Sequence, residues 1–177
     1  MGVEEEYARR VQGMGPAEIR VLWEQVKARK VPEAWPPGRA LEFLLLRAFQ
    51  LERARVVWPY VNDHEQIDGA IHSDGLACIV ETKDHADSIG FEPIAKLTLQ
   101  LQRRPGAAVG LLFSSSKLSL SVIEAVKVHP IRNVLLWRGS DIDMAFQHGM
   151  RASLRIKWRR AVELGDLSYE LQKEDFA

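Results

Sequence analysis

The stretch QIDGAIHSDGLACIVETKDH, which runs from Gln66 to His85, decides the fold of this chain. Two short apolar runs in it flank the pair Asp74-Gly75. An Asp-Gly pair between β-forming residues is typical of a type I′ turn, because both turn residues take positive φ angles. The stretch therefore predicts a β-hairpin with one strand on each side of this turn.

Three charged residues, Asp68, Glu81 and Lys83, interrupt the apolar hairpin. Charges in a buried strand are costly unless they are paired or bind a metal. Counting outward from the turn places Asp68 opposite Glu81, where the Cβ atoms of facing residues lie about 4.5–5.5 Å apart. Lys83 lies two residues beyond Glu81 and therefore shares its face of the strand. Two carboxylates this close favour a divalent cation, although a register shifted by one residue would send Asp68 to the other face.

The pattern of Asp68, twelve further residues and then Glu81-Thr82-Lys83 resembles the D…ExK core of the PD-(D/E)xK nucleases, which have the restriction-endonuclease-like fold. It is most similar to the Mrr-like and Holliday-junction-resolvase-like branch. The resemblance implies that Asp68 and Glu81 bind Mg²⁺, for which Mn²⁺ can substitute, and that Lys83 positions or activates the attacking water. Ile67 stands where the name of the family has proline, a position that varies. An E-x-K triplet alone also occurs on ordinary, half-exposed hairpin edges.

Residues 39–53 predict a helix whose centre reads LEFLLLRAF, and Glu42 lies within its wide apolar face. One interpretation places Glu42 at the edge of this face, where it reaches solvent, because glutamate is rarely fully buried. The resemblance implies another, since the helix before the sheet in such nucleases often carries a glutamate that points into the metal site. Glu42 is therefore the candidate accessory acid.

A second helix, predicted over residues 92–104, carries a polar stripe of Lys96, Gln100 and Arg103. A solvated helix face is the commoner explanation of such a stripe. In nucleases of this kind, however, the helix after E-x-K often places a Gln or Lys over the active site. These three residues are therefore candidate substrate-binding residues.

The remaining patterns alternate between strand and helix. Residues 55–61, RVVWPYV, predict the first strand, with Pro59 at a bulge or an edge. The resemblance implies an α/β core of order αβββαβ, with a mixed central sheet flanked by helices. Residues 38–140 are expected to form this core. Residues 1–37 then form a helical appendage that ends in a Pro-rich linker, and residues 141–177 form a C-terminal helical extension.

Composition bounds the class of protein. The chain has 177 residues, a formal net charge of zero and a single cysteine, Cys78. This length is enough for one domain with a substantial core. One cysteine excludes an internal disulfide and fits a reducing compartment. The first residues lack the apolar segment of a signal peptide, and no apolar run approaches the length of a membrane span, so a cytoplasmic protein is expected.

The function that these features indicate is a Mg²⁺-dependent endonuclease that hydrolyses phosphodiester bonds in DNA. Cutting both strands of a duplex needs two sites, so a homodimer or a partner subunit is expected. The basic residues of two tracts without acidic residues, 93–123 and 144–162, are expected to share one face with Asp68 and to bind phosphates there. The alternatives are a non-catalytic nucleic-acid-binding or scaffold module of a larger defence, repair or mobile-element complex, and a metal-free protein whose hairpin charges form an ordinary salt-bridge cluster.

Overall fold

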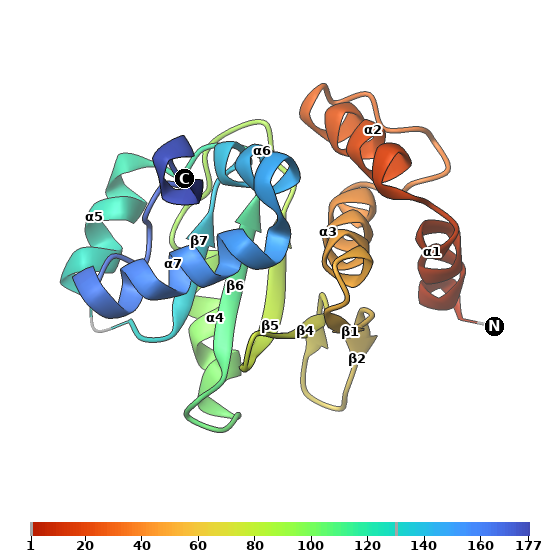
Figure 1. Cartoon of the computed structure of the whole chain (residues 1–177). Helices are drawn as coiled ribbons and strands as arrows, with labels where there is room; N and C mark the ends of the chain where they lie inside the picture. Colours follow the sequence, from red (N-terminus) through yellow and green to blue (C-terminus); the bar gives the residue numbers. More distant parts are fainter. Residues whose placement is uncertain (1, 130) are drawn as a thin grey trace.

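A computed structural model describes residues 2–129 and 131–177, and a mixed five-stranded sheet forms its centre (Figure 1). The strand order is β1-β4-β5-β6-β7. These strands span Arg55–Val57, Ala70–Ser73, Leu76–Lys83, Val109–Ser114 and Val134–Trp137, respectively. Strands β1, β4 and β5 run antiparallel, whereas β5, β6 and β7 run parallel.

Helices cover both faces of the sheet. In chain order they are α1 Val3–Gln12, α2 Pro16–Lys27, α3 Arg39–Leu51, α4 Glu92–Gln102, α5 Leu120–Val128, α6 Gly139–His148 and α7 Met150–Leu164, followed by the short 3₁₀ helix η1 Lys173–Phe176. The order α3, β1, β4, β5, α4, β6 confirms the expected α/β class and its αβββαβ core. No helix in the described ranges is both long and apolar enough to span a membrane.

Alternation along β5 separates two apolar clusters. Cys78 and Val80 belong to the cluster that includes α3 and α7, whereas Ile79 belongs to the cluster formed with α4 and α5. Successive side chains of a strand point to opposite faces, so Glu81 and Lys83 follow Ile79 towards α4. Side chains of α4 can therefore contact Glu81 and Lys83.

The first two helices pack on the core. Buried side chains of α1 and α2, among them Val11 and Trp23, lie in the same apolar cluster as Phe43 and Phe49 of α3. Figure 1 shows α1, α2 and α3 grouped together beside the antiparallel end of the sheet. The expected division of the chain at residues 37 and 140 stays a prediction.

The turn of the hairpin is as expected, but its strands are shorter. Asp74 and Gly75 have φ angles of 53° and 80°, as a type I′ turn requires. Strands β4 and β5 pair from Ser73↔Leu76 to Ala70↔Ile79. The carbonyl of Gly69, whose φ is 144°, accepts a hydrogen bond from Val80 N of β5 at 2.8 Å, and the regular ladder does not continue beyond it. The predicted register is therefore confirmed from Ser73 to Ala70, but its extension to a strand pair of Asp68 with Glu81 was wrong.

The predicted first strand is confirmed over Arg55–Val57 only, because residues 55–61 form two strands that belong to different sheets. Beyond β1, strand β2 (Tyr60–Val61) pairs with β3 (Gln66–Ile67) in a separate two-stranded ribbon. Pro59 lies between β1 and β2 and cannot donate a backbone hydrogen bond, so it ends the pairing of β1.

Replacing Gly69 by alanine is expected to lower the free energy of unfolding by about 2 kcal/mol or more, from backbone strain and overpacking. An added Cβ would lie 2.7 Å from Leu46 Cδ1 and 2.9 Å from the Val57 carbonyl oxygen. Urea unfolding measures the change. Gly106→Ala is the control, since its Cβ would meet no atom within 4 Å. Equal stability of the two variants would contradict the prediction.

Candidate active site

Asp68 lies in the break between β3 and β4, at the point where the chain leaves the main sheet. Its side chain is buried, and Oδ2 accepts hydrogen bonds from Thr82 N at 2.8 Å and Thr82 Oγ1 at 3.1 Å. The Asp68 carboxylate thus accepts a backbone hydrogen bond from β5 that the carbonyl of a neighbouring strand would otherwise accept. This contact, rather than cross-strand pairing, holds Asp68 beside the Glu81-Thr82-Lys83 segment.

Glu81 is buried on the α4 side of β5, with 1% of its surface exposed. Lys83 Nζ lies 2.9 Å from its Oε1, and Lys96 Nζ of α4 lies 2.7 Å from its Oε2. The contact of Lys83 confirms the expectation that Glu81 and Lys83 share a face. In this structure the two lysines neutralise Glu81.

The charges of the two carboxylates act on each other. Burial, reinforced by the negative charge of Glu81, raises the pKa of Asp68. Burial opposes the charge on Lys83, but its contact with Glu81 outweighs burial and raises the pKa of Lys83. Asp68, Glu81 and Lys83 therefore form one electrostatic group, although Asp68 lies outside the strand ladder.

Glu42 joins this group from α3, on the other face of the sheet. Its side chain is 13% exposed, and Arg39 Nη1 donates a hydrogen bond to its Oε2 at 2.7 Å. Burial and the nearby charge of Asp68 raise the pKa of Glu42 to about 7. Glu42 thus lies inside the protein rather than in solvent at the edge of the helix. Sequence reasoning missed Arg39, although its spacing of three residues before Glu42 allows such an ion pair.

The three predicted substrate-binding residues of α4 lie in different surroundings. Lys96 contacts Glu81, as described above. Gln100 is buried, and its Nε2 donates to the Gln66 carbonyl of β3 at 3.1 Å. Arg103, just beyond the end of α4, is exposed and lies 3.7 Å from Glu65. Lys96 and Gln100 therefore border the break that contains Asp68, whereas Arg103 lies at its outer rim.

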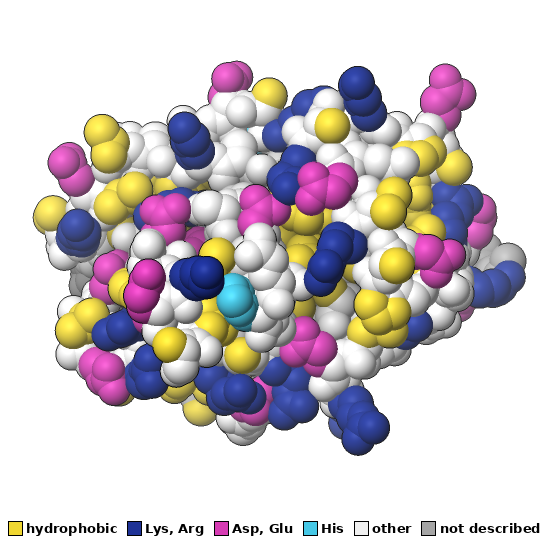
Figure 2. All heavy atoms as spheres, turned by 45° about the horizontal axis from the view of Figure 1, so that its top comes forward, with side chains coloured by type: hydrophobic (Ala, Val, Ile, Leu, Met, Phe, Trp, Pro, Cys, Tyr) yellow, Lys and Arg dark blue, Asp and Glu magenta, His cyan; other side chains and the backbone are white. Residues whose placement is uncertain are grey.

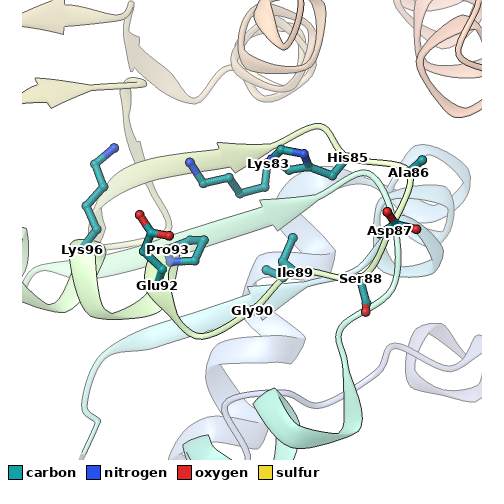
Figure 3. A pocket seen from close by; sticks show the side chains of 10 residues that line it. All are labelled: Lys83, His85, Ala86, Asp87, Ser88, Ile89, Gly90, Glu92, Pro93 and Lys96. Atoms are coloured by element: carbon teal, nitrogen blue, oxygen red, sulfur yellow. The ribbon is translucent and has the colours of Figure 1, made fainter.

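A pocket opens beside Lys83 (Figure 3). It has a volume of about 380 Å³ and is lined by Lys83, by loop residues 85–90 and by Glu92, Pro93 and Lys96 of α4. In Figure 3 the Lys83 side chain extends towards Lys96, while His85, Asp87 and Ser88 lie on the other side. Lys83 and Lys96, which both contact Glu81, line this pocket, whereas Asp68 and Glu81 do not.

The donor atoms fit a magnesium ion that keeps most of its water ligands. Within the ranges that the structure describes, no group of three or more His, Cys, Asp or Glu side chains is arranged to hold a metal. Mg²⁺ needs fewer, because it commonly binds one or two carboxylates and retains several waters. Oε1 of Glu81 is buried and makes no hydrogen bond of good geometry, and the buried Oε1 of Gln100 also has no hydrogen-bond partner. The Gln100 oxygen thus lacks a donor, whereas Glu81 Oε1 lies 2.9 Å from Lys83 Nζ and would exchange that contact for a metal.

The arginines of α7 do not border this site. Arg151 and Arg155 lie 3.0 Å and 2.9 Å from Oδ1 of Asp74, at the turn of the hairpin and thus at the other end of β5. Figure 2 shows positive and negative side chains interspersed over the face that it draws. The expectation that both acid-free tracts present basic residues around the site is therefore wrong for this part of α7.

Comparison with known proteins yields a structural likeness. The chain resembles a solved structure described as the DNA modification-dependent restriction endonuclease AspBHI, with a TM-score of 0.48 and 17% sequence identity. The likeness covers 88% of this chain and 40% of the other, so the chain spans less than half the length of that neighbour. No family model and no curated protein matches the sequence. The fold class is α/β, with a mixed five-stranded sheet flanked by helices.

Proposed function

We propose that this chain is a metal-dependent endonuclease that hydrolyses phosphodiester bonds in DNA. The observation that carries the proposal is the buried group of Asp68, Glu81 and Lys83 beside an open pocket. Buried carboxylates whose charges repel each other destabilise a fold. A bound cation offsets this repulsion.

In this proposal Asp68 and Glu81 hold Mg²⁺, or Mn²⁺ in its place. When bound, the metal supplies positive charge that stabilises the transition state of phosphodiester hydrolysis and acidifies a water. Lys83 orients the attacking water by hydrogen bonding. Glu42 accepts hydrogen bonds from water on the α3 side of Asp68.

Substrate contacts are assigned to α4 and to the pocket. Lys96 would be free of Glu81 with a cation bound at that carboxylate, and its ammonium group would then reach a backbone phosphate. Gln100 and Arg103 extend this contact surface along α4. Because one chain offers one such site, cleavage of both strands of a duplex requires a second copy or a partner subunit.

The proposal predicts that the purified chain cleaves DNA with Mg²⁺ or Mn²⁺ and that EDTA stops the reaction. Duplex, branched and single-stranded DNA, with RNA as a comparison, are incubated with each metal, and products are resolved by electrophoresis. Binding of the metal itself is followed by calorimetry. Absence of cleavage on every substrate, together with absence of metal binding, would contradict the proposal.

A non-catalytic nucleic-acid-binding or scaffold module on the same fold is the second candidate. The pairing of Glu81 with Lys83 and Lys96 favours it, since the ion pairs satisfy the carboxylate without a metal. Such a module binds DNA without cutting it, and its affinity falls as salt rises because phosphate contacts release counterions. Affinity without cleavage, unchanged by EDTA, is the result that would support it.

A further inference from the structure

Arg29 has a backbone conformation that normally favours glycine. It directly follows Ala28, the C-cap residue of α2, and its φ angle is 57°. Its N–H donates to the Val26 carbonyl at 3.1 Å, and the N–H of Lys30 donates to the Gln25 carbonyl at 2.9 Å. These two bonds form a Schellman motif, in which the left-handed position is usually glycine because a Cβ is unfavourable there. The backbone alone therefore gives no reason for an arginine.

The side chain of Arg29 supplies a reason, because it joins α2 to two loops of the sheet. Its guanidinium donates to Asp84 Oδ1, to the His85 carbonyl oxygen and, at 3.1 Å, to Ser115 Oγ. Ser115 Oγ in turn donates to Asp84 Oδ1 at 2.7 Å. We call Arg29, Asp84 and Ser115 the clamp. It holds together the end of α2, the loop after β5 and the loop after β6.

The clamp surrounds the backbone of Lys83. Asp84 is the next residue, and the N–H of Ser115 donates to the Lys83 carbonyl at 3.0 Å. The loop that begins at Asp84 forms the wall of the pocket opposite Lys96 (Figure 3). Its far part is held separately, by a hydrogen bond from Ser116 Oγ to the Asp87 carbonyl and by a bridge between Ile89 and Leu118. Arg29 therefore anchors the part of the loop nearest to Lys83.

We propose that Arg29 is a positioning residue of the active site. It fixes the loop 84–90 and the main chain of Lys83, so that the ammonium group and the pocket wall keep the arrangement that the reaction needs. This inference rests on the proposed nuclease function. It also makes the first 37 residues a contributor to the site, although Arg29 does not touch the acidic group.

The test is Arg29→Gly, which removes the side chain and leaves the backbone in a conformation that glycine prefers. The melting temperature is therefore expected to change little, because relief of the backbone strain offsets the loss of the hydrogen bonds to Asp84 and Ser115. The kcat for DNA cleavage is expected to fall about 10- to 100-fold, since small displacements of positioned groups have effects of that order. KM and the affinity for Mn²⁺ should change less than about twofold, because no ligand or substrate contact is removed.

Arg53→Gly is the matched control. Arg53 follows α3 in the same motif, with a φ angle of 68°, and its N–H donates to the Gln50 carbonyl at 2.9 Å. Among the described residues its exposed side chain has no hydrogen-bond or ion-pair partner. This variant should gain stability, since it relieves the same backbone strain without losing a side-chain contact, and should keep the wild-type kcat. A kcat of Arg29→Gly within twofold of that of Arg53→Gly would overturn the inference.

Hydrogen exchange separates failure of this inference from failure of the proposed function. Amides of the loop 84–90 and of Ser115 are expected to exchange faster in Arg29→Gly than in the wild type or in Arg53→Gly. If the wild type cleaves no DNA, the nuclease proposal fails, while faster exchange still supports the clamp. Unchanged exchange at these amides overturns the clamp whether or not the wild type is active.

Discussion

Glu81→Gln is expected to abolish DNA cleavage, with a loss of about 10³-fold or more in kcat, the order seen when a group that stabilises transition-state charge is removed. Glutamine keeps the shape of the side chain but lacks the charge that would hold Mg²⁺. Metal affinity should fall together with cleavage. Calorimetric titration with Mn²⁺ and single-turnover cleavage measure both. Glu124→Gln, an exposed residue of α5, is the control for loss of one negative charge.

Two further variants distinguish a residue that binds the metal, Asp68, from one that positions the attacking water, Lys83. Asp68→Asn should lose cleavage and metal affinity, like Glu81→Gln. Lys83→Met should lose cleavage but retain metal affinity, because its ammonium group is not a ligand. In the absence of metal, Asp68→Asn should melt at or above the wild-type temperature, since it removes repulsion from Glu81 and Glu42. A lower melting temperature together with undiminished Mn²⁺ binding would instead show that Asp68 serves the fold alone.

The hairpin shows how far local sequence signals reach. The Asp74-Gly75 turn and the pairing of four residues on each side followed from turn chemistry, because that chemistry is local. The break at Gly69 did not follow, since it depends on the close approach of Leu46 and Val57 from other elements. Asp68 nevertheless lies near Glu81, but a hydrogen bond to Thr82 holds it there instead of strand pairing.

Sequence patterns did not predict contacts between side chains that lie far apart in the chain. The helix stripe of α4 was recognised, and Lys96 and Gln100 of that stripe do border Asp68. Nothing in the pattern around Arg29 pointed to Asp84, because their contact depends on how α2 packs against the loop after β5. The buried contacts of Asp141 were not predicted for the same reason, because its partners Lys157 and Leu171 lie far along the chain.

Asp141 is fully buried at the start of α6, where it balances a second buried charge. Lys157 of α7 is 1% exposed, and its Nζ lies 3.1 Å from Asp141 Oδ2. The N–H groups of Arg138 and Leu171 also donate to the carboxylate, each at 2.8 Å. Asp141 thus connects β7, α7 and the C-terminal segment.

Asp141→Ala is expected to lower the free energy of unfolding by about 3–5 kcal/mol, because it leaves a buried ammonium group without its counterion. Urea unfolding at neutral pH measures the loss. Glu6→Ala is the control, because the ion pair of Glu6 with Arg10 is largely exposed and should contribute less than about 1 kcal/mol. The double variant Asp141→Leu/Lys157→Met should recover part of the loss, since no unpaired charge stays buried.

The pH dependence of this loss identifies its cause. Burial lowers the pKa of Lys157, an effect that the charge of Asp141 opposes, so the pKa falls further once Asp141 is gone. The unfolded chain then binds more protons than the folded variant between that lowered pKa and about 10.4, the ordinary value for lysine. Stability of Asp141→Ala should therefore rise with pH in this window, and its deficit relative to the wild type should shrink as pH approaches 10. A deficit that stays constant with pH would assign the loss to the backbone hydrogen bonds of Asp141 instead of to the buried charge of Lys157.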